Sequence, residues 1–517
     1  MIAKLKFPIV IVFIAASFIH CQKQETPQAF QKLERSTPEE QGISSDTLIS
    51  FLEGVQNSGQ EWHSVMILRH GKVVMEAFWN PYQPTDKQQL YSLSKSFTST
   101  AIGLAVDEGL LSVDDPVVKF FPEDLPDTLS ENLSALKVKH LLSMSVGHSQ
   151  DAIRLLEASP QGQSWAETFL SLSVVFEPGT QFMYNSGASY MLANIISNVT
   201  GQSAHEYLKT RLYEPLNISQ ATWTTNSEGV NMGASHLRIT TEDIAKFGQL
   251  YLQKGKWEGK QLLSEHWVTQ ASQKQIVTGE NNHSWGYGYG YQFWMNPPGG
   301  FRADGAFGQY GMVFPDQDMV IAITSESNDK AETMQLAWDL VESISDNELL
   351  AENYSANDKL QAKIKTLGYN PPKMGSGSAF SEKISGKEYR LDSNAFNAES
   401  VSFGFENETV LFTLKTENKP DIVVTCGLNE WVRGENFKPE AHSLFSLRRI
   451  DFDSKMAASA TWQDENTLLL TWRFTETCHG DQLICRFDED GLTIDFRYSL
   501  ARMENRKDGR ESLKGSW

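Results

Sequence analysis

The residue pair with the clearest chemistry is Ser92 and Lys95, which stand three positions apart at the start of a segment with helical periodicity. Residues with this spacing lie on one face of a helix, so the Lys95 amine can reach the Ser92 hydroxyl. The positive potential of a helix N-terminus favours an alkoxide there, and burial lowers the pKa of a lysine, which helps it to accept a proton. The pair therefore predicts a serine nucleophile with its own base.

Other serines offer weaker alternatives. The same spacing recurs in residues 134–137 and 327–330, where the neighbouring residues indicate solvated or loop pairs. Residues 147–151 begin like the G-x-S-x-G nucleophile elbow of α/β-hydrolases, but an aspartate stands in place of the final glycine and no β-branched strand precedes it. The small, apolar helix around Ser92 favours that serine.

The elements that must hold this pair are strands at both ends of a helical region. Residues 64–79 carry two strand-like runs around a His-Gly turn and predict a hairpin, while residues 287–294 and 318–324 predict further strands. Helical periodicity marks residues 92–110, 138–144, 190–199, 241–253 and 330–343. We expect an α+β catalytic domain over residues 36–348, in which distant parts of the chain close one antiparallel sheet.

A second domain is expected at the C-terminal end. Residues 349–380 contain Pro-Pro and Gly-Ser turn signals and are interpreted as a linker. Beyond them, residues 381–517 carry period-two runs separated by turns, with little helical signal. This pattern predicts an antiparallel β domain, whose role the sequence does not show.

The N-terminal residues have another character. Two lysines precede an apolar run over residues 7–19, and Cys21 follows. The run is too short to span a membrane and is typical of a secretory signal. We interpret residues 1–21 as a signal peptide of lipoprotein type, with Cys21 as the lipidation site, and residues 22–35 as a polar linker. His20 departs from that pattern, since a small residue normally precedes the acceptor cysteine. Plain cleavage and an uncleaved anchor stay open. The expected location is the periplasm or cell envelope.

Composition excludes several classes of function. The 65 acidic and 45 basic residues give a net charge of −20, and no basic patch indicates a nucleic-acid partner. The four cysteines lack metal-binding spacing, so neither a metal nor a cofactor is implied. Cys478 and Cys485 flank a turn-like stretch, residues 479–482, and two states stay open for them: a disulfide across a hairpin, or two reduced thiols.

Residues 91–97 resemble the active-site helix of the serine β-lactamase and penicillin-binding-protein superfamily. Further segments agree in order along residues 40–345. They are residues 108–116, 139–147 (KHLLSMSVG), 178–187 (PGTQFMYNSG) and 303–311 (ADGAFGQYG). The resemblance implies a β-lactamase/transpeptidase-like fold for the catalytic domain.

The resemblance also implies an acyl-enzyme mechanism. Ser92 attacks a carbonyl, Lys95 and Tyr184 transfer the proton, and water later releases the acyl group. By the same resemblance, the backbone N–H groups of Ser92 and Ala306 hold the oxyanion. The neighbouring Asn185 and Gly305 are expected at the same substrate and oxyanion site.

Two departures bear on the substrate. The second motif reads Tyr184-Asn185-Ser186 instead of Tyr-x-Asn, a form that we associate with the branch resembling 6-aminohexanoate-dimer hydrolases. The third motif usually begins with a lysine or histidine that grips a substrate carboxylate, but residues 303–305 read Ala-Asp-Gly. Strand alternation places Arg302 and Asp304 on one face, where they can pair. The alternative is that Arg302 replaces the missing cation.

Together these observations predict an exported serine hydrolase that cleaves small ester, amide or peptide substrates. A D-alanyl carboxypeptidase or β-lactamase is the alternative within the class. A catalytically silent binding protein of the cell envelope is the alternative from another class. We expect membrane association by a lipid anchor at most, and the sequence does not define the oligomeric state.

Overall fold

The computed structural model describes residues 32–280, 283–344, 350–371, 379–437, 454–499 and 505–517. The expected signal peptide and the expected lipidation site Cys21 lie outside these residues. Within the described part, no helix combines the length and the apolar character that crossing a membrane requires.

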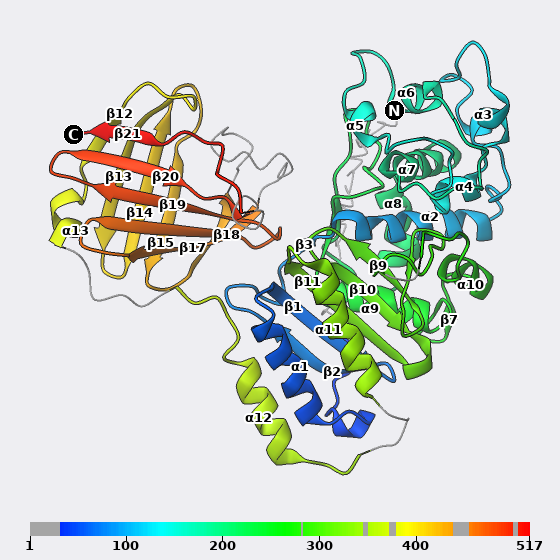
Figure 1. Cartoon of the computed structure of the whole chain (residues 1–517), viewed down its shortest axis with the longest axis horizontal. Coiled ribbons are helices and arrows are strands. Elements are labelled where there is room, and N and C mark those ends of the chain that lie inside the picture. Colours follow the sequence, from blue (N-terminus) through cyan, green and yellow to red (C-terminus); the bar gives the residue numbers. More distant parts are fainter. Residues whose placement is uncertain (1–31, 281–282, 345–349, 372–378, 438–453, 500–504) are drawn as a thin grey trace, which may run out of the picture. The chain divides into compact units, whose positions relative to one another are not determined.

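The expected catalytic domain is built on a six-stranded antiparallel sheet with the order β2-β1-β11-β10-β9-β8. The expected hairpin is its outer pair, and the turn at His70 and Gly71 takes positive φ angles. Strands far apart in sequence meet at its centre, which confirms the expected α+β class (Figure 1). The strands are β1 (Glu61–Arg69), β2 (Lys72–Phe78), β8 (Trp294–Met295), β9 (Phe301–Gly305), β10 (Gln309–Phe314) and β11 (Met319–Glu326).

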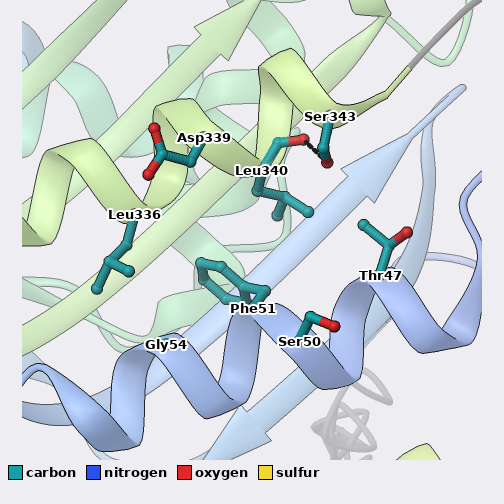
Figure 2. A pocket seen from close by; sticks show the side chains of 8 residues that line it. All are labelled: Thr47, Ser50, Phe51, Gly54, Leu336, Asp339, Leu340 and Ser343. Atoms are coloured by element: carbon teal, nitrogen blue, oxygen red, sulfur yellow. Dashed lines mark hydrogen bonds between the residues drawn. The ribbon is translucent and has the colours of Figure 1, made fainter.

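Helices α1 (Ser45–Asn57), α11 (Lys330–Ser343) and α12 (Tyr354–Ile364) cover one face of this sheet (Figure 1). The bounds of α11 agree with the predicted segment, and Asp329 caps its first turn. A hollow of about 380 Å³ lies between α1 and α11, and Figure 2 shows the side chains that line it. Its lining residues are Thr47, Ser50, Phe51, Gly54, Leu336, Asp339, Leu340 and Ser343.

The segment expected as a linker differs from that expectation. Helix α12 packs on α1, and its Leu360 is fully buried in the same core. Farther on, Tyr369 exchanges hydrogen bonds with the backbone of Trp62 in β1. The Pro and Gly turn signals lie mainly beyond this packed part, which explains why they extended the predicted linker too far.

The opposite face carries the helical region. Helix α2 (Ser94–Asp107) runs through it with residues 94–105 all buried, and α7 (Ser186–Thr200) and α9 (Thr241–Leu252) pack beside it. The shorter α-helices are α3 (Glu131–Ala135), α4 (Val138–Leu142), α5 (Ile153–Glu157), α6 (Trp165–Ser171), α8 (Ala204–Leu208) and α10 (Glu265–Ser272). The 3₁₀ turns are η1 (Glu39–Gln41), η2 (Tyr91–Leu93), η3 (Val117–Phe120) and η5 (Pro315–Gln317), and η4 (Lys209–Tyr213) is a π-helical turn.

Two small sheets complete this domain. In the first, β3 (Gln88–Gln89) and β4 (Thr222–Trp223) pair with β5 (Leu237–Ile239), so that β3 is fixed just before η2. The second is the pair β6 (Lys256–Trp257) and β7 (Lys260–Gln261).

The aromatic stretch at residues 287–294 was predicted as a strand, but only its last residue enters one, β8. The backbone turns at Gly288 and Gln292, which have φ angles of 116° and 66°. A Cβ at Gly290 would lie 2.2 Å from the carbonyl oxygen of Ala271, so the chain passes too close to α10 for any larger residue. The glycines that alternate with aromatics therefore produce an irregular packed segment.

The C-terminal part forms a ten-stranded β-barrel with the order β15-β14-β13-β12-β21-β20-β19-β18-β17-β16, preceded by α13 (Ala379–Ile384) (Figure 1). A short parallel pairing of β15 with β17 closes it, whereas all its other pairs are antiparallel as expected. The strands are β12 (Glu388–Leu391), β13 (Ala398–Glu406), β14 (Thr409–Thr416), β15 (Ile422–Leu428), β16 (Val432–Phe437), β17 (Ser454–Trp462), β18 (Thr467–Phe474), β19 (Gly480–Phe487), β20 (Gly491–Phe496) and β21 (Leu513–Ser516).

The cysteines resolve the alternative that the sequence left open. Cys426, Cys478 and Cys485 are all free and buried. The turn between β18 and β19 covers residues 475–479, earlier than the predicted 479–482, so Cys478 lies within it, whereas Cys485 lies in β19 opposite Leu468 of β18. They therefore do not face each other.

The barrel contacts the catalytic domain within the compact unit Leu33–Trp517. Arg473 of β18 forms an ion pair with Glu61 of β1. Arg433 of β16 pairs with Asp86 at 2.5 Å. The amide of Gln89 in β3 donates to the carbonyl of Glu476 in the β18–β19 turn, at 3.1 Å. This turn therefore lies beside the strand that leads into η2.

Candidate active site

Ser92 stands at the entrance to the buried helix α2. The preceding residue, Tyr91, has a φ angle of 49°, a left-handed conformation that costs a non-glycine residue about 1–2 kcal/mol. Tyr91 also begins the 3₁₀ turn η2, which leads directly into α2. Ser92 is half-buried, while residues 93–105 are buried, so its hydroxyl is the accessible polar group at this end of the helix.

The predicted contact between Ser92 and Lys95 is confirmed. The Lys95 side chain is buried, and its Nζ lies 3.4 Å from the Ser92 Oγ. The same amine donates to the Ser186 Oγ at 3.4 Å and to the carbonyl oxygen of Ala234 at 3.0 Å. Partners from three separate segments therefore orient the amine toward the serine.

The segment that contributes Ala234 is fixed by a glycine. Gly233 has a φ angle of 60°, and a Cβ there would lie 2.4 Å from the carbonyl oxygen of Ser189 in α7. The Thr98 hydroxyl of α2 donates to the Gly233 carbonyl at 2.7 Å. Only a glycine allows this close approach, and the approach brings the Ala234 carbonyl to Lys95.

Tyr184 lies beside the same amine. Lys95 Nζ is 5.0 Å from the centre of its ring. Burial raises the pKa of the Tyr184 hydroxyl well above its usual range; a hydrogen bond with Ser92 opposes the shift, and the carboxylates of Asp304 and Asp151 add to it. Tyr184 is therefore neutral around pH 7 and offers a hydroxyl proton next to Ser92.

Asn185, the residue after Tyr184, was expected at the substrate site, but its side chain lies inside the fold. The Asn185 side chain is fully buried and caps α7, where its Oδ1 accepts from the amides of Ala188 and Ala152. Its Nδ2 lies 3.1 Å from Nδ1 of His148. Because the structure turns Asn185 into the fold, Ser186 faces Lys95 in its place.

Asp151 fixes the start of α7 from the outside. Its Oδ1 accepts from the Ser186 amide at 2.8 Å and from the Gly187 amide at 3.4 Å. A carboxylate at a helix N-terminus is stabilised by the unpaired amides and the helix dipole. Asp151, which occupies the position that disqualified the nucleophile elbow, thus has a structural role that the sequence pattern did not suggest.

Gly305 and Ala306 lie at the end of β9, which contacts η2. A Cβ at Gly305 would lie 2.2 Å from the carbonyl oxygen of Leu90, so this strand end runs directly against the segment before Ser92. Gln309 holds the turn, because its Nε2 donates to the carbonyls of Ala306 and Ser325. Among the described residues, the amides of Ser92 and Ala306 have no protein acceptor.

The third-motif positions provide no exposed cation. Ala303 is buried in the core on one face of β9. On the other face, Arg302 donates from Nε to Asp304 at 3.0 Å, which confirms the predicted pairing. The Arg302 side chain is 0% exposed, so it does not replace the missing cation of the motif, contrary to the alternative considered above.

Aromatic side chains form one side of the site. Trp294 stacks on Tyr184 with 5.9 Å between ring centres, and Phe182 contacts Trp294 at 5.5 Å. Tyr289 lies behind them, fully buried. The irregular segment at residues 287–294 therefore supplies an apolar wall next to the nucleophile.

Gln292, also missed by sequence reasoning, ties this segment to three helices. Its carbonyl accepts from Ser96 of α2, its Oε1 accepts from Ser189 of α7, and its Nε2 donates to the carbonyls of Leu141 and Leu142 in α4. No motif signalled this glutamine. For Ser186, the signal was available, because it occupies the last position of the Tyr-x-Asn spacing.

Comparisons with known proteins agree with this architecture. The family model described as Beta-lactamase matches residues 53–345. The 6-aminohexanoate-dimer hydrolase of Paenarthrobacter ureafaciens is 26% identical over 316 residues, which cover 57% of this chain and 80% of that protein. A putative D-alanyl-D-alanine carboxypeptidase of Escherichia coli strain K12 is 22% identical over 242 residues, which cover 41% of this chain and 56% of that protein.

Among solved structures, the octameric penicillin-binding protein homologue from Pyrococcus abyssi aligns with a TM-score of 0.47 and 17% identity, over 91% of this chain and 99% of that chain. The family match covers more than half of the chain and spans all of the expected catalytic residues. It confirms the resemblance that residues 91–97 first indicated. The chain belongs to the beta-lactamase family.

Proposed function

We propose that the protein is a serine hydrolase that cleaves small ester or amide bonds through an acyl-enzyme on Ser92. The family generally consists of hydrolases of such bonds. The observation that carries the proposal is the 3.4 Å contact between Lys95 Nζ and Ser92 Oγ, with the neutral Tyr184 beside both. Retention of all three groups in contact argues against a catalytically silent binding protein.

In the proposed acylation, Ser92 Oγ forms a bond to the substrate carbonyl carbon while its proton passes to Lys95 Nζ. The resulting oxyanion accepts hydrogen bonds from the amides of Ser92 and Ala306, which have no other acceptor among the described residues. When the intermediate collapses, the bond to the leaving alcohol or amine breaks. The leaving group takes its proton from the Tyr184 hydroxyl, which regains one from Lys95.

Deacylation reverses these roles. Water replaces the leaving group, Tyr184 and Lys95 accept its proton, and the oxygen attacks the acyl carbon. The bond to Ser92 Oγ then breaks, and the serine recovers its proton as the carboxylic acid leaves. The raised pKa of Tyr184 supports the relay role, because a neutral hydroxyl can both donate and accept a hydrogen bond.

We further propose that the acyl part of the substrate is uncharged. The aromatic wall of Phe182 and Trp294 favours apolar groups, and the Arg302 charge is fully buried and paired with Asp304. The similar hydrolase from Paenarthrobacter ureafaciens is named for the 6-aminohexanoate dimer, a precedent for an amide bond but not for an uncharged acyl part. Export and lipid attachment at Cys21 are part of the proposal and rest on the sequence pattern alone.

The decisive experiment is labelling with a serine-reactive phosphonate, followed by mass mapping. We expect one adduct, on Ser92, and none in Ser92→Ala. Ser149→Ala is the matched control, because that exposed serine belongs to the rejected nucleophile elbow and its loss should leave labelling unchanged. A panel of p-nitrophenyl esters, amides, D-amino-acid peptides and a chromogenic cephalosporin then assigns the substrate class. Equal labelling of Ser92→Ala, or an adduct on Ser149, would refute the assignment.

A further inference from the structure

The β18–β19 turn of the barrel reaches the residues that flank the proposed oxyanion hole. The ring of His479 lies 4.8 Å from that of Phe307 and 6.2 Å from that of Tyr91. Tyr91 and Phe307 contact each other edge to face at 5.1 Å. One residue of the C-terminal domain therefore touches two separate segments of the catalytic domain.

These two segments carry the two oxyanion amides. Tyr91 directly precedes Ser92, and Phe307 directly follows Ala306. Both aromatic residues have positive φ angles, 49° and 63°. Residues with bulky side chains adopt such backbone angles only where the surroundings impose them, and the contacts of both rings are part of those surroundings.

His479 is itself held at both ring nitrogens. Its Nδ1 lies 2.6 Å from the Glu326 Oε1, which also accepts from the Ser499 hydroxyl at 2.5 Å. Its Nε2 lies 2.9 Å from the Tyr91 Oη. Burial opposes the charged ring, but contacts with Cys478 and with the Glu326 carboxylate raise the pKa of His479. The ring therefore links Glu326 to Tyr91 through its two nitrogens.

Phe307 is fixed from the catalytic side. Its carbonyl accepts from the Ser325 hydroxyl at 2.7 Å and from the Ser327 amide at 2.9 Å. These donors lie at the end of β11, on either side of Glu326. The same strand end therefore anchors His479 and the turn after Ala306, and Tyr91 completes the arrangement.

A competing interpretation is that Cys478 is a second nucleophile. Its Sγ lies 3.6 Å from Nδ1 of His479, and the same nitrogen lies 2.6 Å from Oε1 of Glu326, so the three side chains resemble a Cys-His-Glu arrangement. The Cys478 side chain is 1% exposed, and burial raises the pKa of its thiol. A buried, neutral thiol lacks both access and nucleophilicity. Cys478 is therefore a packing residue here.

We propose that His479 is a positioning residue for the oxyanion hole: through Tyr91 and Phe307, it fixes the separation and direction of the amides of Ser92 and Ala306. This inference rests on the proposed serine hydrolase function. It gives the barrel a role in catalysis without substrate contact, because misplacement of hole donors by a fraction of an ångström weakens their hydrogen bonds to the transition state.

The test compares a p-nitrophenyl ester with its thionoester, in which sulfur replaces the carbonyl oxygen. Sulfur is a larger and weaker acceptor, so the thionoester gains little from a well-formed oxyanion hole. We expect His479→Ala to lower kcat for the oxygen ester by on the order of 10–100-fold with KM little changed. The thionoester rate should fall far less, so the ratio of the two rates should collapse. Tyr91→Phe, which keeps the ring, should give a smaller effect in the same direction.

Arg433→Gln is the matched control at the same domain contact. It removes the ion pair with Asp86 and should lower the melting temperature while the rate ratio stays at the wild-type value. His479→Gln keeps a side-chain donor and should recover part of the ratio. If His479→Ala does not fold, the ratio of ester to thionoester rates is measured with His479→Gln and Tyr91→Phe instead.

The outcomes separate the two claims. If His479→Ala lowers the rates for the ester and the thionoester equally, or lowers neither rate, the positioning role is refuted and His479 makes only a structural contact. Absence of Ser92-dependent turnover in the wild-type protein instead refutes the proposed function itself.

Discussion

The Nε atom of Arg302 lies 3.0 Å from Oδ2 of Asp304, and the two side chains are 0% and 5% exposed. The remaining guanidinium donors go to the carbonyls of Ser284 and Met295 and to the Asn296 side chain. The Asp304 carboxylate also accepts from Trp285. Both charges are thus paired inside the fold. At these positions, binding of a substrate carboxylate would need a cation that is free to contact the substrate.

This pairing predicts the substrate profile. Short-chain p-nitrophenyl esters and uncharged amides should be turned over well, and a chromogenic cephalosporin poorly or not at all. Arg302→Ala should destabilise the fold by about 3–5 kcal/mol, because it leaves a buried carboxylate unpaired. The ratio of ester to cephalosporin kcat/KM should not change. A cephalosporin value that matches the ester value in wild type and is lost in Arg302→Ala would contradict this profile.

Lys95 should act as a base, not as a fixed charge. Lys95→Ala should lower the acylation rate by on the order of 10²–10⁴-fold, and Lys95→Arg should fail as well, because arginine stays protonated. Stopped-flow acylation with an activated ester measures both. Lys137→Ala, at the exposed Ser-x-x-Lys repeat paired with Asp114, is the control and should be neutral. An active Lys95→Arg variant would show that the residue supplies only charge.

Gly305→Ala tests the close approach of β9 to η2. The added Cβ would meet the Leu90 carbonyl oxygen at 2.2 Å, so the strand end must move away from Ser92. We expect kcat to fall by at least about tenfold, since the Ala306 amide moves with it. Gly434→Ala in β16 is the control, because its Cβ meets no atom within 4 Å. Wild-type kcat in Gly305→Ala would argue against an oxyanion role for Ala306.

His148 should make stability fall in mild acid. Burial lowers its pKa to about 4, whereas an unfolded histidine titrates near 6.5. Between these values the unfolded chain binds a proton that the folded chain does not, so the free energy of unfolding decreases as the pH falls from about 6.5 to 4, by up to about 3 kcal/mol. His148→Asn, which keeps an acceptor for Asn185, should make this slope shallower, while the buried His140, whose pKa is also lowered to about 4, keeps its own contribution. His266→Asn, at an exposed position, should leave it unchanged.

Export can be tested on the full chain. The mature protein should begin at Cys21 and partition with membranes, and Cys21→Ser should release it or block processing. Intact-mass measurement decides between the possibilities. A soluble mature form that begins at another residue would keep the signal peptide and remove the lipid.

The sequence predicted those features that depend on residues close together along the chain. The bounds of α11 follow from its Asp329 cap and its apolar periodicity, and the pair Ser92 and Lys95 follows from helix geometry. By contrast, whether Asn185 or Ser186 faces Lys95 depends on how α7 is rotated at its start, which Asp151 and His148 determine from other segments. The Tyr-x-Asn spacing points to Ser186, but it does not show the contacts that fix this rotation.

The least predictable feature is His479, which contacts Tyr91 from 388 residues away. Its neighbours in sequence indicated a turn and a cysteine pair, and neither suggested a contact beside the nucleophile. Contacts of this separation are set by how two independently formed cores meet, which periodicity and turn chemistry do not encode.

Strand β21 has a consequence for the order of events during synthesis. It lies between β12 and β20, so the barrel ring stays open until residues 513–516 have been made. At about 5–20 residues per second, a ribosome needs about 10–30 s to pass from the end of α11 to that point. During this interval a nascent chain already contains Ser92 and Lys95 but not a finished barrel to present His479. Full alignment of the active site would thus be among the last steps in the maturation of each molecule.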